Sequence, residues 1–291
     1  MPMSPRLLRP RASGTAVHPE AVDWATRVTA NGGTVSSNTL AAVSTFCASI
    51  ALESGLRSAI LRLNLFAGNS DASLNAVRTP LYLSGSLGGA TIGNTTDTNF
   101  NFVAGDYAET GSGGGLKGDG TSKYLNTGFN YSSIPSANST HLSFSGTSLE
   151  TTSGDRMALG SFEFPGDLNR LCILDIQTGT SLRGYRSSTV GQAQFNNSGI
   201  TAEPHMIGTR TSVTLNRVYR SGSQAAESTT TAGPTTFARP FAVFAGNNNG
   251  TVSAFTAGRL RMYSIGNGLT AAQALAFSNA VIAFNTALGR A

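Results

Sequence analysis

The spacing of apolar residues changes along the chain, and its first part is helical. In residues 19–60 apolar side chains recur every three or four positions, which is typical of amphipathic helices. Pro19 stands where proline opens a helix, and an Asn-Gly-Gly segment ends that helix. A second helix begins at Ser36 or the next residue and runs through Leu52, and a short third piece follows near residues 56–60. The expected buried positions are Val22, Trp24, Ala25 and Val28 in the first helix, and Leu40, Val43, Phe46, Cys47 and Ile50 in the second.

From Leu61 onward the period becomes two, which predicts β-strands separated by clusters of Gly, Ser, Asn and Pro. Two polar segments, 219–224 and 246–250, are typical of hairpin tips, because Asn and Gly accept positive φ angles. Residues 70–107 mix turn residues with short apolar pieces, and we expect long loops there, across one face of the sheets. The predicted strands cover residues 61–66, 123–128, 141–145, 156–160, 170–176, 181–186, 205–209, 212–219, 241–245 and 252–265.

The chain ends with a Gly-Asn-Gly turn and a helix over residues 269–289, capped by Thr270. Leu275, Ile282 and Leu288 lie near helical spacing and form its expected buried face. Together these patterns predict a mainly β protein, in which a small helical N-terminal unit (19–60) precedes a sandwich with a terminal helix packed on it (61–291). A β-domain closed by one helix, without an evident catalytic cluster, favours a binding or assembly module.

The amino-acid composition limits the kinds of partner that we expect. Only 12% of the residues are charged and 34 are glycine, which indicates a neutral, hydrogen-bonding surface suited to assembly or to sugars. The net charge of +5 comes almost wholly from arginine, a side chain suited to bidentate contacts at protein interfaces. No stripe of basic and aromatic residues accompanies these arginines, so we do not expect nucleic-acid binding. Cys47 and Cys172 lie in apolar runs and are expected to be buried free thiols.

The first residues differ in character from the rest. Residues 1–18 hold prolines and arginines with little periodicity, and they lack the apolar core of a signal peptide. No segment approaches the ~20 apolar residues of a membrane span, so we expect a soluble protein made in a cytoplasm. We interpret residues 1–18 as an extended basic arm that becomes ordered on a partner, with a disordered tail as the alternative. The expected partner contacts of the arm are Arg6, Leu7, Leu8, Arg9 and Arg11.

The candidate catalytic residues are sparse. Glycoside hydrolysis needs two carboxyl groups on either side of the scissile bond. The closest acidic pairs are Asp106 with Glu109 and Glu163 with Asp167, and the second spans a Pro-Gly turn. No motif of a nucleophilic triad surrounds the histidines, and we expect strand-edge positions for two of them. These two histidines are His141 and His205, and the third is His18.

Two kinds of binding stay open. Calcium prefers hard oxygen ligands in turns, such as those near Asp71, Asp97 and Asp119, but Asp119 between two glycines is more simply a turn residue. We therefore assign no cofactor and no metal ligands. Sugar binding would use exposed aromatic rings and amides, with the hairpin residues Asn247, Asn248 and Asn249 as the glycan-contact loop. The aromatic candidates are Tyr82, Tyr107, Tyr124, Tyr131, Tyr185 and Phe255, whereas Trp24 is expected in the core.

Several segments together resemble a known family. They are Arg62-Leu-Asn-Leu-Phe66, the Asp-Gly-Thr segment at 119–121 before Tyr124, Val218-Tyr-Arg-Ser-Gly222, the Asn-rich hairpin, and the Ser-Ile-Gly-Asn-Gly-Leu turn at 264–269. Over residues 19–291 the chain resembles virion-associated proteins of tailed bacteriophages that have a jelly-roll domain similar to concanavalin A or laminin G. The resemblance implies a component of the phage head, neck or tail, and its motifs are structural, not catalytic.

We therefore expect a non-enzymatic structural protein of a tailed-phage particle, such as a head decoration, a neck or collar protein, or a tail or fibre protein. Its partners would be other virion proteins and further copies of itself, and it would dock through its N-terminal arm. Two alternatives stay open: a glycan- or receptor-binding module of a tail fibre, and a polysaccharide-degrading enzyme.

Overall fold

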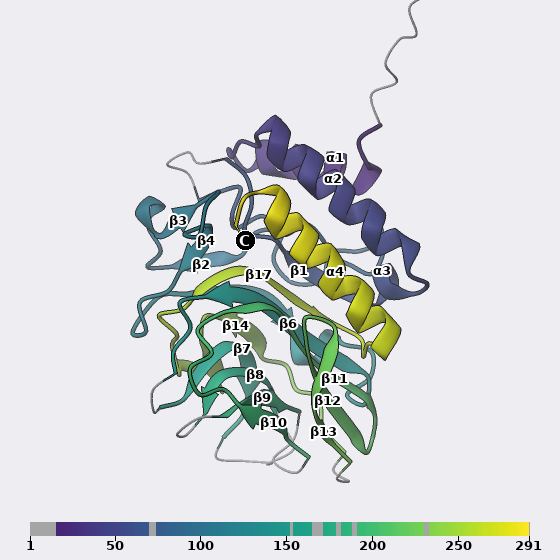
Figure 1. Cartoon of the computed structure of the whole chain (residues 1–291), viewed down its shortest axis with the longest axis vertical. Coiled ribbons are helices and arrows are strands. Elements are labelled where there is room, and N and C mark those ends of the chain that lie inside the picture. Colours follow the sequence, from purple (N-terminus) through teal and green to yellow (C-terminus); the bar gives the residue numbers. More distant parts are fainter. Residues whose placement is uncertain are drawn as a thin grey trace, which may run out of the picture.

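The protein is built in three layers, two β-sheets packed face to face and a group of helices on the outer face of one sheet (Figure 1). The computed structural model describes residues 16–69, 74–151, 154–164, 171–178, 182–187, 191–229 and 233–290. The predicted fold class, a mainly β sandwich with a C-terminal helix packed on it, is confirmed. The helices are α1 (Pro19–Ala30), α2 (Ser37–Leu52), α3 (Leu56–Ala59) and α4 (Ala271–Ala287), with short 3-10 turns at Ala104–Asp106 and Tyr131–Ser133.

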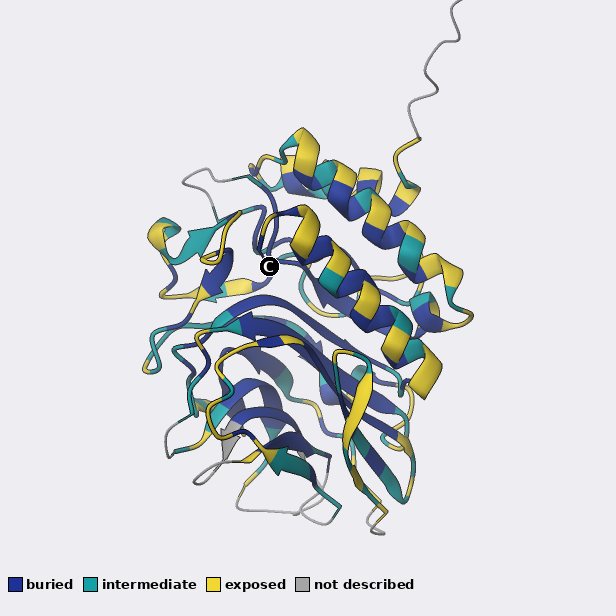
Figure 2. Ribbon diagram, viewed as in Figure 1, coloured by how far each residue is buried: buried dark blue, intermediate teal, exposed yellow. Residues whose placement is uncertain are grey.

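The first sheet follows the order β13-β12-β11-β6-β17-β4-β3, and β1 adds to β17. Its members are β1 (Ile60–Asn64), β3 (Tyr107–Ala108), β4 (Gly115–Lys117), β6 (Thr140–Thr147), β11 (Glu203–Ser212), β12 (Leu215–Arg220), β13 (Ser223–Ser228) and β17 (Arg259–Gly266). All its neighbouring strands are antiparallel. Since helices cover one face and the second sheet the other, β6 and β17 are buried along almost their whole length (Figure 2).

The second sheet follows the order β10-β9-β8-β7-β14-β5-β2, with β15 beside β7 and β16 beside β15. Its members are β2 (Thr98–Phe100), β5 (Tyr124–Asn130), β7 (Arg156–Phe162), β8 (Leu171–Thr178), β9 (Leu182–Arg186), β10 (Ala193–Asn196), β14 (Pro240–Val243), β15 (Gly246–Asn248) and β16 (Thr251–Ser253). Only β15 and β7 pair in parallel. Both predicted hairpin tips are confirmed: Ser221-Gly222 joins β12 to β13 and Asn249-Gly250 joins β15 to β16, all four residues at positive φ.

Two apolar cores hold the layers together. The core between the sheets contains Phe129, Leu142, Phe244 and Tyr263 among others. The core between the first sheet and the helices contains Trp24, Phe46, Met262 and Phe277. Trp24 also donates from its indole nitrogen to the carbonyl oxygen of Thr79 at 3.0 Å, as suits a buried tryptophan.

The helix starts follow the predicted capping residues. The Ser36 hydroxyl accepts from the amide of Thr39, and Thr270 forms a capping box with Gln273. The predicted buried faces are partly wrong, because Val22 and Leu275 are each 49% exposed. Ala21 takes the place of Val22 in the core. The buried face of α4 and its C-terminal end consists of Ala274, Phe277, Val281, Phe284 and Leu288. This face is turned by about one residue from the expected one.

Some strand predictions are wrong at places where contacts between distant parts of the chain, and not the local sequence pattern, determine the structure. The run 252–265 was expected as one strand, but it divides into β16 and β17 around residues 254–258, where Ala254 has a φ of 56°. The short edge strands β2, β3, β4 and β10 carry too few residues for a visible period. Within 70–107, residues 70–73 lie outside the described part, and Tyr82 pairs with Leu63 while its ring is buried below the helices.

Four arginines are fully buried inside the protein instead of serving an interface, which corrects the general expectation for arginine here. Arg62 contacts Asp97 and Arg183 contacts Glu203, at 2.7 and 2.6 Å, with both partners fully buried. The guanidinium of Arg290, beyond α4, donates to the carbonyl oxygens of Glu109, Leu65 and Phe66. The fourth is Arg210.

Both cysteines are free and buried, as predicted. Among the described residues, no helix is both long and apolar enough to cross a membrane.

Candidate functional site

The carboxylates that could carry catalysis are mostly held by basic side chains. Asp106 pairs with Lys123 at 2.6 Å. Glu109 is buried and accepts from the Thr39 hydroxyl at 2.5 Å and from the Gly68 amide at 3.1 Å. The other ion pairs of described acids are Glu20–Arg57, Asp23–Arg27, Asp97–Arg62, Glu109–Arg290, Glu150–Arg156, Glu163–Arg239, Asp175–Arg186, Glu203–Arg183, Glu203–Arg220 and Glu227–Arg217.

The predicted acidic pairs therefore do not form a catalytic pair in the part of the chain that is described. Glu163 contacts Arg239 at 3.4 Å, and its sequence neighbour Asp167 lies outside the described residues. Of the aspartates considered for calcium, Asp97 is fully buried and Asp71 also lies outside that part. Asp119 closes its own turn by accepting from the amides of Thr121, Ser122 and Lys123. Burial raises the pKa of this carboxyl group, but these bonds together outweigh it and hold the pKa below the usual range.

The histidines His141 and His205 lie under α4 and not at a strand edge, which corrects the prediction. They sit on the adjacent central strands β6 and β11, and both are fully buried. The His205 ring lies between the Ser278 and Ser143 hydroxyls at 3.0 Å from each, while His141 contacts the Asn267 carbonyl oxygen at 2.6 Å. A carbonyl oxygen only accepts, so Nδ1 of His141 carries the proton.

This hydrogen-bond network joins α4 to the first sheet, and it does not form a substrate-binding site. The Ser264 hydroxyl contacts both His141 Nε2, at 3.0 Å, and the Ser143 hydroxyl, at 2.7 Å. The ring of Phe277 packs against His205 at 4.7 Å between centroids. Burial lowers the pKa of His141 to about 4, and burial together with the charge of His141 lowers the pKa of His205 to about 3.

We therefore expect stability to fall as the pH drops below the ordinary histidine value. Because the unfolded chain binds protons near pH 6.5 and the folded protein only near 4 and 3, the stability is complete above pH 6.5 and declines below it. At pH 5 one histidine accounts for a loss of about 2 kcal/mol. Urea unfolding of the protein and of His205→Gln between pH 7.5 and 5 measures this, and the variant should lose roughly half of the slope. An unfolding free energy that stayed constant over this range would contradict the assignment.

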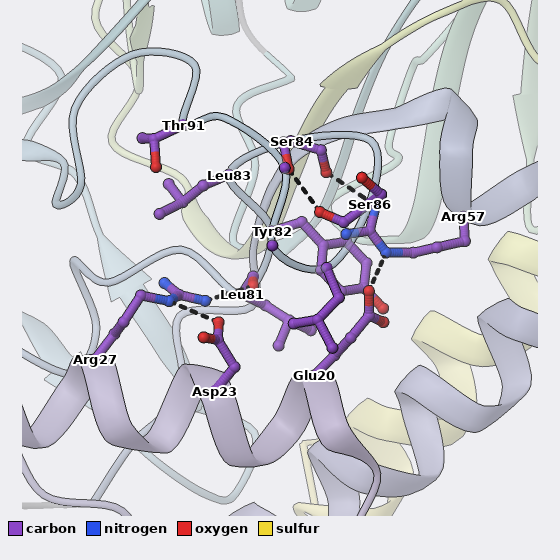
Figure 3. A pocket seen from close by; sticks show the side chains of 13 residues that line it. Glu20, Asp23, Arg27, Arg57, Leu81, Tyr82, Leu83, Ser84, Ser86 and Thr91 are labelled. Atoms are coloured by element: carbon purple, nitrogen blue, oxygen red, sulfur yellow. Dashed lines mark hydrogen bonds and ion pairs between the residues drawn. The ribbon is translucent and has the colours of Figure 1, made fainter.

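A small pocket of about 120 Å³ lies between α1, α3 and the loop that carries Tyr82 (Figure 3). Its charged side chains pair with each other: Arg57 contacts Glu20 at 2.5 Å and lies 3.7 Å over the Tyr82 ring, and Arg27 contacts Asp23 at 2.9 Å (Figure 3). Figure 3 shows Arg57 and Glu20 reaching towards each other from two different helices, whereas Asp23 and Arg27 both come from α1. Arg57 therefore links α1, through Glu20, to the loop, through the Tyr82 ring.

Next to this pocket, His18, Glu20 and Cys47 have potential metal-ligand atoms within 4.8 Å of one another. Each of them already has a structural role. Nδ1 of His18 accepts from the Glu20 amide at the start of α1, and the Glu20 carboxylate holds Arg57. Burial raises the pKa of the Cys47 thiol to about 12, which keeps it protonated. These bonds explain the cluster without a metal ion.

A second, larger pocket has a different charge balance. It encloses about 690 Å³ between the last turns of α4, the ends of β6 and β17, and the glycine-rich loop before β4. We call it the arginine pocket, since Arg259 and Arg261 of β17 line it together with Ser112, Thr147, Ile282 and Asn285. Its volume lies in the range of small-molecule sites.

A β-bulge lies at Arg261, beside this pocket. Leu260 of β17 pairs with Gly146 of β6, and Met262 pairs with Ser145, so Arg261 is the extra residue between two paired ones. Leu260 packs between the two sheets and Met262 packs under the helices. An unbroken strand would place residues two apart on the same face, so the bulge turns the strand over at this point.

Neither arginine has a carboxylate within 4 Å among the described residues. Arg259 donates to the carbonyl oxygens of Gly115 and Asp106, at 2.8 and 3.4 Å. Arg261 donates only to the Ser112 carbonyl oxygen, at 3.5 Å, and its buried Nε has no partner. Burial lowers the pKa of the Arg259 guanidinium, the charge of Asp106 opposes this, and the charge of Arg290 adds to it. Burial and the positive charges of Arg290 and Arg259 lower the pKa of Arg261.

The aromatic and amide residues considered for sugar binding are only partly brought together. Tyr82, Tyr131 and Tyr185 are buried in the cores and Tyr107 is half-buried. Tyr124 and Phe255 do meet at the surface, where the Tyr124 ring stacks on Phe100 at 4.3 Å and lies 6.1 Å from Phe255. No local pattern marks Phe100 as part of this cluster, because only the pairing of β2 with β5 places it there.

The side chains of the Asn-rich hairpin make bonds within the protein. Asn247 donates to the Pro240 carbonyl oxygen at 2.9 Å, Asn248 accepts from the Phe164 amide at 2.8 Å, and Asn249 accepts from Arg239 at 2.7 Å. A glycan contact at this loop stays a prediction. The predicted arm residues lie outside the described part of the chain; they are Arg6, Leu7, Leu8, Arg9 and Arg11.

No protein-family model matches the sequence, and the curated proteins gave no match. Among solved structures, the binding domain of botulinum neurotoxin serotype D is 11% identical with a TM-score of 0.45, over 79% of this chain and 52% of that one. A Trypanosoma rangeli sialidase is 12% identical with a TM-score of 0.42, over 76% of this chain and 32% of that one. The CBM40 of a Ruminococcus gnavus sialidase, bound to α2,3-sialyllactose, is 11% identical with a TM-score of 0.33, over 46% and 78%. The chain thus spans about a third of the sialidase, and these similarities carry no argument about ligand or activity.

Proposed function

We propose that this protein works by binding and not by catalysis, as a structural component of a tailed-phage particle. The observation that carries the binding role is the distribution of charge: most described carboxylates are held in ion pairs, whereas the two arginines of the arginine pocket have no carboxylate within 4 Å among the described residues. The histidines give further support, because His141 and His205 are buried under α4. A general acid or base must reach its substrate, and neither ring does.

The location on a phage particle rests on the sequence resemblance described above. In this proposal the three-layer body is the module that is displayed, and residues 1–18 attach it to other virion proteins. Where the described part of the chain begins, the His18 amide donates to the Ser44 hydroxyl at 2.8 Å, which joins the start of α1 to α2. We also propose that the displayed body associates with further copies of itself.

Deletion of residues 1–17 tests the attachment. The truncated protein should keep the melting temperature of the full chain but should no longer join particles when it is supplied to phage that lack the protein. A full-length variant with Arg6, Arg9 and Arg11 changed to glutamine separates the charges of the arm from its length, and it should join particles poorly. Normal incorporation of the truncated protein would contradict docking through the arm.

Glycan binding by the displayed body is the second candidate. The stacked rings of Phe100 and Tyr124, with Phe255 beside them, offer partly exposed aromatic faces of the kind on which sugar rings stack. This surface and the arginine pocket favour a host-surface glycan as an additional partner.

A further inference from the structure

The arginine pocket has a charge that the fold does not need. A buried ion usually requires a counter-ion to repay the loss of water, as in the buried pairs Arg62–Asp97 and Arg183–Glu203. Arg261 is only 7% exposed, yet its neighbours in the pocket are neutral carbonyl, hydroxyl and amide groups and a second arginine. Like charges in such a site lower stability, which indicates that the pocket is arranged for something that is not part of the folded chain.

The donors and acceptors of the pocket describe its ligand. Two guanidinium groups offer several N–H donors to an anion, with the planar geometry that suits a carboxylate. The lining of the pocket also includes hydroxyl groups from Ser112, Thr147 and Thr286. Thr147 Oγ1 and Asn285 Oδ1 are buried without a partner, and an amide oxygen of this kind accepts from a ligand hydroxyl.

The size and lining of the pocket narrow the class of ligand further. A volume of about 690 Å³ exceeds what an inorganic anion fills and suits a mono- or disaccharide. None of the described residues that line the pocket is aromatic, so it lacks the stacking surfaces with which proteins bind single-stranded nucleic acid. We propose that the arginine pocket binds a carboxylate-bearing saccharide, of the hexuronic-acid or sialic-acid class. This inference rests on the proposed binding role, but not on the arm or on the phage particle.

Titration of the full-length protein followed by NMR tests the assignment, with glucuronic acid and N-acetylneuraminic acid as probes. At least one acid should bind in the millimolar range or tighter, with galactose and inorganic phosphate at least tenfold weaker. Arg259→Gln and Arg261→Gln should each weaken binding at least tenfold, because each removes charged donors from the carboxylate.

The matched control is Lys117→Gln. It removes the same charge from an exposed position on β4, directly opposite Arg259 and outside the pocket lining, so binding should not change. Gly113→Tyr provides an independent block. A side-chain carbon at Gly113 meets nothing within 4 Å, so the ring can fill the mouth of the pocket without disturbing the fold. It should abolish binding with an unchanged melting temperature.

Arg261→Gln should also melt at the same or a higher temperature than the wild-type protein, which a purely structural arginine would not do. The proposal is overturned if neither acid binds, if phosphate binds as tightly as the sugars, or if the arginine and Gly113 variants bind normally. Loss of saccharide binding together with normal arm-dependent incorporation would remove this inference alone and leave the attachment role.

Discussion

Asp97→Ala is expected to lower the free energy of unfolding by about 3–5 kcal/mol, the usual cost of leaving a buried charge without its partner. The Asp97 carboxylate accepts from Arg62 at 2.7 Å, from Asn64 at 2.9 Å and from the Tyr263 hydroxyl at 2.8 Å, all inside the protein. Arg62 stands on β1 and Tyr263 on β17, so this one carboxylate joins the edge strand after the helices to the centre of the first sheet. Urea denaturation followed by circular dichroism measures the change.

Asp23→Ala provides the comparison, because Asp23 forms an ion pair with Arg27 while its side chain is 48% exposed. An exposed pair of this kind contributes about 1 kcal/mol or less. The double variant of Asp97 and Arg62 should lose less than the sum of the two single changes, since each single change leaves the other group unpaired. Equal effects of Asp97→Ala and Asp23→Ala would show that the core network does not hold β1 in place.

Phe277→Ala is expected to lower the unfolding free energy by about 3–5 kcal/mol, as truncation of a buried phenylalanine does. Its ring packs on His205 at 4.7 Å, on His141 at 6.3 Å and on Phe46 of α2 at 6.5 Å, so it contacts both the sheet and a second helix. Its loss would leave a cavity between the helices and the sheet.

Leu275→Ala is the matched control on the same helix. Leu275 lies two residues earlier and is 49% exposed, so its truncation should change stability by about 0.5 kcal/mol or less. Thermal unfolding of both variants compares the two faces of α4 directly. A larger effect from Leu275 than from Phe277 would restore the buried face that the sequence pattern indicated and contradict the packing described here.

The sequence predicts the class of fold well, because the change of period at Leu61 and the Asn-Gly turns are local signals. It misplaces the buried face of α4, since that helix consists mostly of small and apolar residues and has little contrast between its sides. His141 and His205 show the same limit. A polar residue in an apolar strand indicates an edge or a solvent face, unless a covering helix supplies partners such as Ser278.

The candidate site is harder to predict. Arg259 and Arg261 are two among many arginines in the sequence, and nothing in their spacing marks them. These two arginines can be recognised only from the folded protein. Its ion pairs show that most described acids are engaged by other basic side chains. The bulge at Arg261 depends on how β17 pairs with β6, a long-range feature that a local pattern does not contain.

The central claim is that this protein acts by contact and not by turnover. The most direct test incubates the purified full-length protein with a uronate-containing and a sialylated polysaccharide, and follows both the bound polymer and the appearance of new reducing ends. We predict retention of at least one polymer, diminished in Arg261→Gln, with no increase in reducing ends over time. New reducing ends that increase with time and with protein concentration would contradict the account.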